Sequence, residues 1–221
     1  GSKRLPRKNL MPLGGRPMLA WTIDAAAASG GFDQVHVSTE DAEIAEVAER
    51  HGAVVHHRPE ALAQDLSSSA DVCLDAADAV VSSGGPHDAL ICLQPSSPLM
   101  TAADVQGAWE AFVARDASFL LSVTPIDPHY FHWALEQRNG EWRPYFGDTF
   151  MRDRLELPEV FRPNGAIKIA AVDALRSQGN FFGSPLAVHP MPEERSVHVA
   201  DSLNVRLADL LLNDRLRGEG S

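Results

Sequence analysis

Short apolar runs of strand length alternate with segments of helix length along the first 125 residues of this chain. The strand-like runs lie at 35–38, 53–56, 89–94 and 119–124, and the helix-length segments lie at 18–28, 42–50, 69–82 and 101–114. This alternation is typical of strand–helix–strand units, which build a mainly parallel sheet. We therefore predict an α/β fold, with all 221 residues in one domain.

The most apolar of these runs, 89–94, predicts a central strand of the sheet. It leads directly into Pro-Ser-Ser-Pro at 95–98, and a loop at the carboxyl end of such a strand is where α/β sheets bind ligands. Further along the chain the patterns predict a turn into a strand at 161–169, short edge strands at 186–189 and 197–199, and a closing amphipathic helix at 203–216.

The regular alternation stops between residues 125 and 158, where aromatic, histidine and charged side chains are concentrated. Such a segment does not suit the sheet, so we expect an excursion that covers the site as a lid or packs on a second subunit. The second alternative is favoured because so many exposed aromatic side chains would otherwise form a sticky patch. We therefore expect a homodimer.

Positive charge is concentrated at one end of an acidic chain. There are 19 basic and 30 acidic residues, a formal net charge of −11, so neither a nucleic acid nor an anionic membrane is expected as a partner. Four cations nevertheless fall within residues 3–8, namely Lys3, Arg4, Arg7 and Lys8. Such a run with small residues at its head suits a triphosphate, and the alternative is a solvated basic terminus.

The two cysteines, Cys73 and Cys92, both lie in apolar runs. This favours reduced core residues over a disulfide or a metal site, and with them a cytoplasmic location. No apolar run approaches the length of about 18 residues that suggests a membrane-spanning helix, and no signal-peptide pattern is present.

Four separated segments carry a family resemblance: GSKRLPRKN at 1–9, RPEALAQDLSSS at 58–69, LQPSSPL at 93–99 and RPNGAI at 162–167. Together they resemble the N-acylneuraminate cytidylyltransferases, and the similarity extends over nearly the whole chain. The resemblance implies a Rossmann-like three-layer α/β/α nucleotidyltransferase fold. It also implies transfer of CMP from CTP to an acidic sugar, a sialic acid or related nonulosonic acid, with magnesium as cofactor and pyrophosphate as product.

The resemblance places a nucleotide site on the first two segments. Lys3 and Lys8 match the lysines that bind the triphosphate, which makes them the expected catalytic residues, and Ser2 and Asn9 lie beside them. Arg58 matches an arginine that reaches the nucleotide, and the serines at 67–69 (Ser67, Ser68 and Ser69) match the loop that reads cytosine. Simple helix capping is the alternative role for these serines, and it is compatible with base contact.

The acceptor sugar is assigned by the resemblance to the later segments. The matching residues are Gln94, Ser97, Arg154, Arg162, Asn164, Phe181 and Phe182. An arginine fork suits a carboxylate, which favours an acidic acceptor, although ion pairing with Glu156 or Glu159 would also explain the arginines. Core packing would explain the two phenylalanines equally well.

The chain departs from the family pattern in three ways. It begins within the nucleotide motif, so the family's buried first strand has no counterpart in the sequence. His198 and Ala200 occupy the positions of two magnesium-binding aspartates, which leaves Asp201 and His198 as the candidate metal ligands. At positions that help to hold the sugar, His132 replaces a lysine, Lys168 a tyrosine and Met100 an arginine. Two alternatives therefore stay open: another acidic acceptor, such as a phosphonate or another keto sugar acid, and a catalytically silent nucleotide-binding protein.

Overall fold

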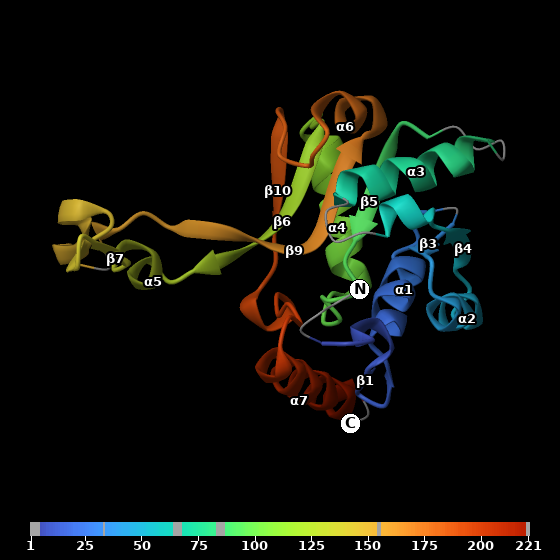
Figure 1. Ribbon diagram of the computed structural model, residues 1–221, viewed down its shortest axis with the longest axis horizontal. Coiled ribbons are helices and arrows are strands. Elements are labelled where there is room, and N and C mark those ends of the chain that lie inside the picture. Colours follow the sequence, from blue (N-terminus) through green and yellow to red (C-terminus); the bar gives the residue numbers. More distant parts are fainter. Residues whose placement is uncertain (1–4, 33, 64–67, 83–86, 154–155, 220–221) are drawn as a thin grey trace.

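The computed structural model describes residues 5–32, 34–63, 68–82, 87–153 and 156–219. Helices cover both faces of a sheet, and a long arm extends from one side of this body (Figure 1). The predicted α/β class with three layers is confirmed.

The main sheet has four strands in the order β10-β6-β9-β5. These are β5 (Ala89–Leu93), β6 (Phe119–Ile126), β9 (Val160–Ala171) and β10 (Leu186–Pro190). β10 is parallel to β6, whereas β9 is antiparallel to both β5 and β6. The sheet is therefore mixed, and β9 is the strand that runs against the other three.

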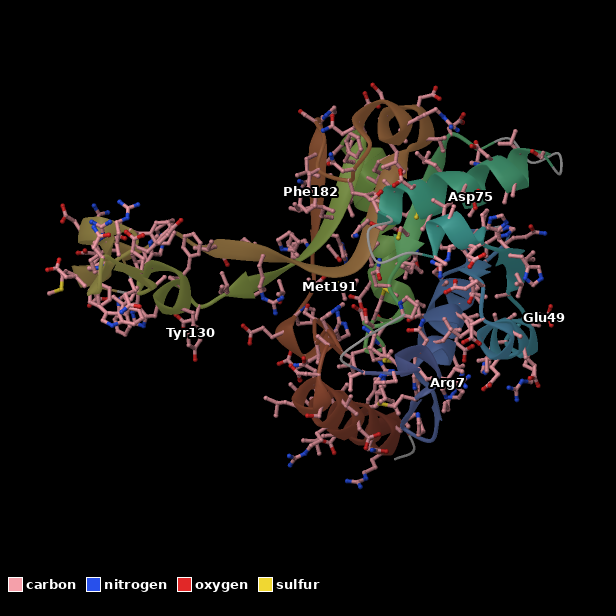
Figure 2. The ribbon with its side chains drawn as sticks, in the orientation of Figure 1. Arg7, Glu49, Asp75, Tyr130, Phe182 and Met191 are labelled. Carbon is pink, nitrogen blue, oxygen red and sulfur yellow. The ribbon has the colours of Figure 1, made fainter. Side chains whose placement is uncertain are left out.

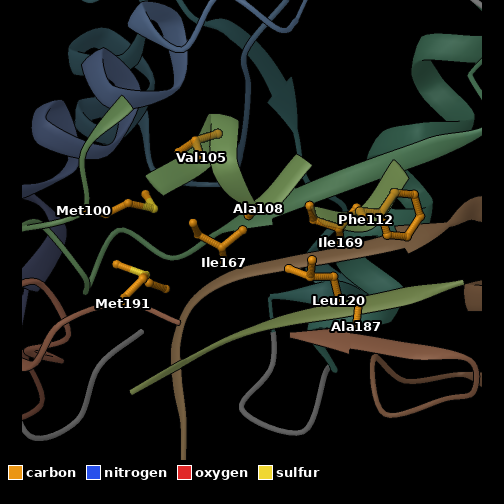
Figure 3. Close-up of a cluster of buried hydrophobic side chains, with 10 residues drawn as sticks. Met100, Val105, Ala108, Phe112, Leu120, Ile167, Ile169, Ala187 and Met191 are labelled. Atoms are coloured by element: carbon orange, nitrogen blue, oxygen red, sulfur yellow. The ribbon is translucent and has the colours of Figure 1, made fainter. Parts of the chain in front are cut away.

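One face of the main sheet is covered by α4 (Ala102–Ala114). Val105 and Phe112 of this helix pack with Leu120, Ile167 and Ile169 of the strands in a fully apolar cluster (Figure 3). The helix approaches β10 so closely that a Cβ added at Gly107 would lie 2.8 Å from the His189 ring. α4 therefore needs glycine at that point.

The opposite face is covered by α3 (Ser69–Ser82) and α6 (Val172–Gln178). Ala70 and Leu175 of these helices pack with Phe119, Leu121 and Phe181. The side chains of Cys92 and Leu90 on β5 join the same cluster, which places them on the α3 side of the sheet.

β3 (His36–Thr39) and β4 (Val54–His57) form a separate parallel pair. They pack against α1 (Met18–Ala28) and α2 (Ala42–Arg50) through a cluster that includes Leu19, Ile23 and Val47. β3 and β5 do not hydrogen-bond to each other. Residues of both strands line one cavity.

Side-chain caps explain why two helices begin where the sequence predicts. The Asp41 carboxylate accepts hydrogen bonds from the backbone N–H groups of Glu43 and Ile44, at 2.9 and 3.2 Å. Thr101 and Asp104 form a reciprocal capping box at the start of α4. The predicted ranges 18–28 and 42–50 coincide with α1 and α2.

The segment at 125–158 forms the outer part of the arm, with the ends of β6 and β9 as its stem (Figure 1). It contains α5 (Pro128–His132), a hairpin of β7 (Leu135–Arg138) and β8 (Glu141–Pro144), and the 3-10 helix η3 (Gly147–Met151). Aromatic rings pack on one another inside it, as Phe131 and Phe146 do at 4.5 Å between centroids. Within the described part of the chain, β7 and β8 pair only with each other and do not join the main sheet.

The chain ends in α7 (Ser202–Glu219), which packs beside the short hairpin of β1 (Pro12–Leu13) and β2 (Arg16–Pro17). The predicted strand at 197–199 is wrong, because these residues pair with no strand. Val199 makes a single backbone hydrogen bond, from its N–H to the Ser96 carbonyl at 2.7 Å, and one such bond does not make a ladder. Among the described residues, no helix is both long and apolar enough to cross a membrane.

Candidate functional site

A cavity of about 1200 Å³ lies among β3, β5, α1 and α3. Its deeper walls are apolar and include Ile23, Val37 and Ile91. Six predicted site residues contribute to its lining: Lys8, Asn9, Arg58, Ser68, Ser69 and Gln94. Arg58 and Gln94 directly follow the carboxyl ends of β4 and β5, where α/β folds bind ligands.

Lys8 connects the cavity to the segment before α7. The Lys8 ammonium donates a hydrogen bond to the Val199 carbonyl at 3.0 Å. The backbone N–H of Val199 in turn donates to the Ser96 carbonyl. The neighbouring Arg7 points elsewhere and pairs with Glu43 on α2. Lys8 and Arg7 are therefore distinguished by the structure, and Lys8 is the one that faces the cavity.

Arg58 is ion-paired with Glu40 across the cavity rim. Burial of Glu40 favours its neutral form, but hydrogen bonds from Arg58 outweigh burial and hold the pKa of Glu40 below its usual value. A phosphate that reached Arg58 would therefore compete with an ionised carboxylate for the guanidinium.

The two described serines of the 67–69 loop have different roles. Ser68 caps α3, since its hydroxyl accepts from the Asp71 N–H at 3.1 Å and donates to the Asp71 carboxylate at 2.8 Å. The Ser69 hydroxyl instead accepts from the Lys168 ammonium at 3.1 Å. The capping alternative thus holds for Ser68, while both serines still line the cavity.

Gln94 lies beside a pair of free thiols, Cys73 and Cys92. Its side-chain nitrogen is 3.9 Å from the Cys92 sulfur, and its backbone N–H donates to the Ala166 carbonyl at 3.0 Å. A hydrogen bond with Cys92 and burial raise the pKa of Cys73 far above its usual value. The Cys73 thiol therefore stays protonated, which excludes it as a nucleophile near neutral pH.

Asn164 is held inside the protein. Its amide nitrogen donates to the Ser196 hydroxyl at 2.9 Å and to the Met191 sulfur at 3.3 Å. Its amide oxygen accepts from the Ser122 hydroxyl at 2.5 Å and from the Ala166 N–H at 3.1 Å. Both donors and both acceptor positions are used, so we assign Asn164 a structural role in place of the predicted acceptor contact.

The other predicted acceptor residues lie outside the cavity lining. Ser97 is buried and Phe181 packs in the core cluster under α3 and α6. Phe182 points outward with 64% of its side chain exposed, as Figure 2 shows. Arg162 is exposed on the arm side of β9 and forms no ion pair with a described residue. The alternative role, an ion pair between Arg162 and Glu159, is therefore not seen. Ser2, Lys3, Ser67 and Arg154 lie outside the described residues.

The predicted metal ligands do not assemble into a site. Asp201 accepts the Asn204 N–H at 2.9 Å and so caps α7, while the His198 ring lies 3.3 Å from the Ser96 hydroxyl. No group of three or more histidine, cysteine or acidic side chains in the described ranges is arranged to hold a metal ion. Magnesium prefers carboxylate oxygens, so these residues do not fit a magnesium site built by the protein.

Sequence reasoning missed Ser96 as a site residue, and it named Lys168 only as a departure from the family pattern. Ser96 lines the cavity and holds Val199, and Lys168 holds Ser69. The signal for Lys168 is its position between Ile167 and Ile169, because a lysine inside an apolar strand is uncommon. Met100 and His132, the other altered positions, are both buried and away from the cavity.

Comparisons with known proteins bear on this site. The family model described as Cytidylyltransferase matches residues 1–130. The chain is 35% identical over 214 residues to the pseudaminic acid cytidylyltransferase of Campylobacter jejuni serotype O:2, covering 96% of this chain and 91% of that protein. It is 31% identical over 202 residues to the N-acylneuraminate cytidylyltransferase of Streptococcus agalactiae serotype V, covering 90% of this chain and 48% of that protein.

A solved structure supports the same fold. CMP:2-keto-3-deoxy-manno-octonic acid synthetase, complexed with CTP, matches with a TM-score of 0.72 at 16% identity. The match covers 97% of this chain and 95% of that chain. At this identity the match shows that the two chains share a fold.

Proposed function

This chain belongs to the cytidylyltransferase family, as its motifs predict, and from that premise we propose that it transfers CMP from CTP to a sialic acid or a related nonulosonic acid. The enzyme class follows from the family, and the acceptor is the proposed step. The names of the relatives support it, because the two described above act on pseudaminic acid and on an N-acylneuraminate.

The observation that carries the proposal is the set of polar side chains around the cavity. Lys8 and Arg58 supply positive charge, and Ser68, Ser69 and Gln94 supply groups that hydrogen-bond to uncharged parts of a ligand. Cations beside neutral hydrogen-bonding groups suit a nucleoside triphosphate and a polyhydroxylated sugar held together. A site for a wholly apolar ligand would not contain them.

The reaction requires these groups to position two anions. A hydroxyl oxygen of the acceptor forms a bond to the α-phosphorus of CTP, and the bond from that phosphorus to pyrophosphate breaks. The electron pair of the broken bond leaves with pyrophosphate, and the hydroxyl proton passes to solvent. In this proposal Lys8 offsets the charge that develops on the leaving group, Arg58 and the 68–69 serines seat the nucleotide, and Gln94 binds the sugar.

Pyrophosphate release tests the acceptor. We expect release from CTP in the presence of pseudaminic acid or N-acetylneuraminic acid, and much less with ATP, GTP or UTP. The panel includes 2-keto-3-deoxy-octonic acid and a phosphonate. Turnover with one of these alone would replace the proposed acceptor, and binding of CTP without any turnover would support a silent protein.

A magnesium requirement is part of the proposal and rests on the resemblance. Because magnesium keeps several waters and binds substrate phosphates through few protein ligands, we expect it to reach the site with CTP. Excess EDTA should abolish pyrophosphate release and added magnesium should restore it; activity that survives EDTA would contradict the requirement.

A homodimer formed through the arm is also proposed. Tyr130 and Trp142 are 82% and 67% exposed on it, which is unusual for aromatic side chains on a free surface. A second subunit would cover these two exposed rings. The free thiols of Cys73 and Cys92 support a reducing, cytoplasmic location.

A further inference from the structure

Lys168 places a positive charge in the middle of the main sheet. It lies on β9 opposite Cys92 of β5 and Leu121 of β6, and its neighbours Ile167 and Ile169 are buried on the other face. Its side chain reaches the α3 side, where the ammonium donates to the Ser69 hydroxyl at 3.1 Å. The ammonium also lies 5.4 Å from the centre of the Phe181 ring.

Within the described residues, the charge of Lys168 is not balanced by a carboxylate. No carboxylate oxygen of the described residues comes within 4.0 Å of its nitrogen. An ammonium has three N–H donors, and one of them is used by Ser69. Ser69 is the first residue of α3, and the start of a helix carries partial positive charge, so the helix does not offset the ammonium. A half-buried cation in this state is stabilised by an anion that binds beside it.

Lys168 adjoins the part of the cavity assigned to the acceptor. Ser69, Cys92 and Gln94 all line the cavity, and Ser69 and Cys92 are direct neighbours of Lys168. The Gln94 side chain reaches the Cys92 sulfur, so Gln94 lies on the same face of the sheet as Lys168. An acceptor that contacts Gln94 would therefore present its other groups near the ammonium.

We propose that Lys168 binds the carboxylate of the acceptor and thereby selects acidic sugars. The inference rests on the proposed cytidylyl transfer and names the group that recognises the acid. A carboxylate would accept the remaining N–H donors and neutralise the charge, while Gln94 binds a hydroxyl group. Loss of a hydrogen bond to a charged group corresponds to about a tenfold to hundredfold weaker binding.

The test compares two acceptors with two forms of the enzyme. The acceptors are a nonulosonic acid that the enzyme uses and its carboxamide, which lacks the negative charge. Binding is measured by calorimetry with a non-hydrolysable CTP analogue present, so that it does not depend on turnover. We expect Lys168→Gln to weaken binding of the acid by about tenfold to hundredfold and to leave binding of the carboxamide and of the CTP analogue unchanged.

Matched variants separate recognition from structure. Arg176→Gln removes the same charge from an exposed ion pair with Asp78 and should leave all three affinities unchanged. Ser69→Ala removes the hydrogen bond to Lys168 and should spare the preference for the acid over the carboxamide. If Lys168→Gln does not fold, Lys168→Met, which replaces the aliphatic stem, carries the same expectation.

Each result decides the proposal. Equal losses for acid and carboxamide in Lys168→Gln, or a loss confined to the CTP analogue, would overturn it and show that Lys168 only supports Ser69. If the unmodified enzyme binds the acid and releases no pyrophosphate, the proposed transfer fails while the role of Lys168 is still decided by the variants. If the unmodified enzyme binds no acidic sugar, both proposals fail.

Discussion

Lys8 and Arg7 are adjacent cations whose surroundings differ. Lys8 lines the cavity, whereas Arg7 is exposed and pairs with Glu43. We predict that Lys8→Ala weakens CTP binding by about tenfold to hundredfold, because a charge-assisted contact with phosphate is lost. Arg7→Ala is the control and should leave CTP affinity unchanged, since exposed ion pairs contribute little. Calorimetry measures both, and a change of less than about threefold in Lys8→Ala would contradict the assignment.

Asn164, unlike Lys8, does not face the cavity. Its side-chain amide makes all of its hydrogen bonds to groups inside the protein. Asn164→Ala leaves the groups around it unsatisfied, so we predict a loss of about 2–4 kcal/mol in the free energy of unfolding. Asn180, an exposed residue whose side chain accepts from the Phe182 N–H and donates to the Gln178 carbonyl, is the control, and its alanine variant should lose less than about 1 kcal/mol. Urea denaturation gives both values. An Asn164→Ala protein of normal stability that no longer binds the acceptor would restore the predicted substrate role.

The contrast between these residues shows what the sequence could predict about the site. Lys8, Arg58 and Gln94 stand next to turns and strand ends, and local pattern plus family motif placed them at the cavity. Apart from Ala166, the hydrogen-bond partners of Asn164 and Lys168 lie 27 to 99 positions away along the chain. Whether a polar side chain is fully bonded or left with spare donors depends on such distant partners, and the sequence pattern does not contain them.

At the scale of elements, the start of α4 is fixed to the segment before α7 by a buried ion pair. Asp104 is 3% exposed, accepts from Thr101 and binds Arg195 through two hydrogen bonds of 2.8 and 2.9 Å. We predict that Arg195→Ala lowers the free energy of unfolding by about 1–3 kcal/mol, since it leaves a buried carboxylate with fewer partners. Arg176→Ala breaks a similar but exposed pair with Asp78 and should change the free energy of unfolding much less, because solvent screens exposed ion pairs.

The same ion pair gives an expected pH dependence. Burial of Asp104 favours its neutral form, but hydrogen bonds from Arg195 and Thr101 outweigh burial and hold the pKa of Asp104 below its usual value. The stability contributed by a group with a lowered pKa is present above its unfolded pKa and is lost as the pH falls through the folded value. Urea midpoints measured from pH 6 to pH 3 should therefore fall less steeply toward pH 3 in Arg195→Ala than in the unmodified protein, because without Arg195 the folded and unfolded pKa values of Asp104 lie closer together. Parallel pH profiles would show that the pair does not set this pKa.

Helices were predicted more accurately than strands. The caps of α2 and α4 and the glycines after α1 are local signals, so their boundaries follow from neighbouring residues. The segment 197–199 has an alternating pattern but no strand beside it, and alternation alone does not supply a partner. The reversed direction of β9 is likewise a property of its pairing with β5 and β6.

At the scale of the whole molecule, the body and the arm expose different kinds of surface. The body buries its apolar side chains in four clusters between helices and strands. The arm is thin, and it exposes the side chains of Tyr130, Trp142 and Tyr145, of which Tyr130 is labelled in Figure 2. An element that cannot bury its own aromatic side chains gains most from a partner surface.

The arm therefore supplies the last prediction. Trp142→Glu places a charge on the most exposed tryptophan of the hairpin, and we expect it to shift a homodimer to the monomer, because an interface core excludes unpaired charge. Leu210→Glu, an equally drastic change at an exposed leucine of α7, is the control and should leave the dimer intact. Sedimentation velocity over a range of protein concentrations separates the two states. A monomeric unmodified protein at all concentrations, or a dimer that persists in Trp142→Glu and dissociates in Leu210→Glu, would place the interface elsewhere or remove it.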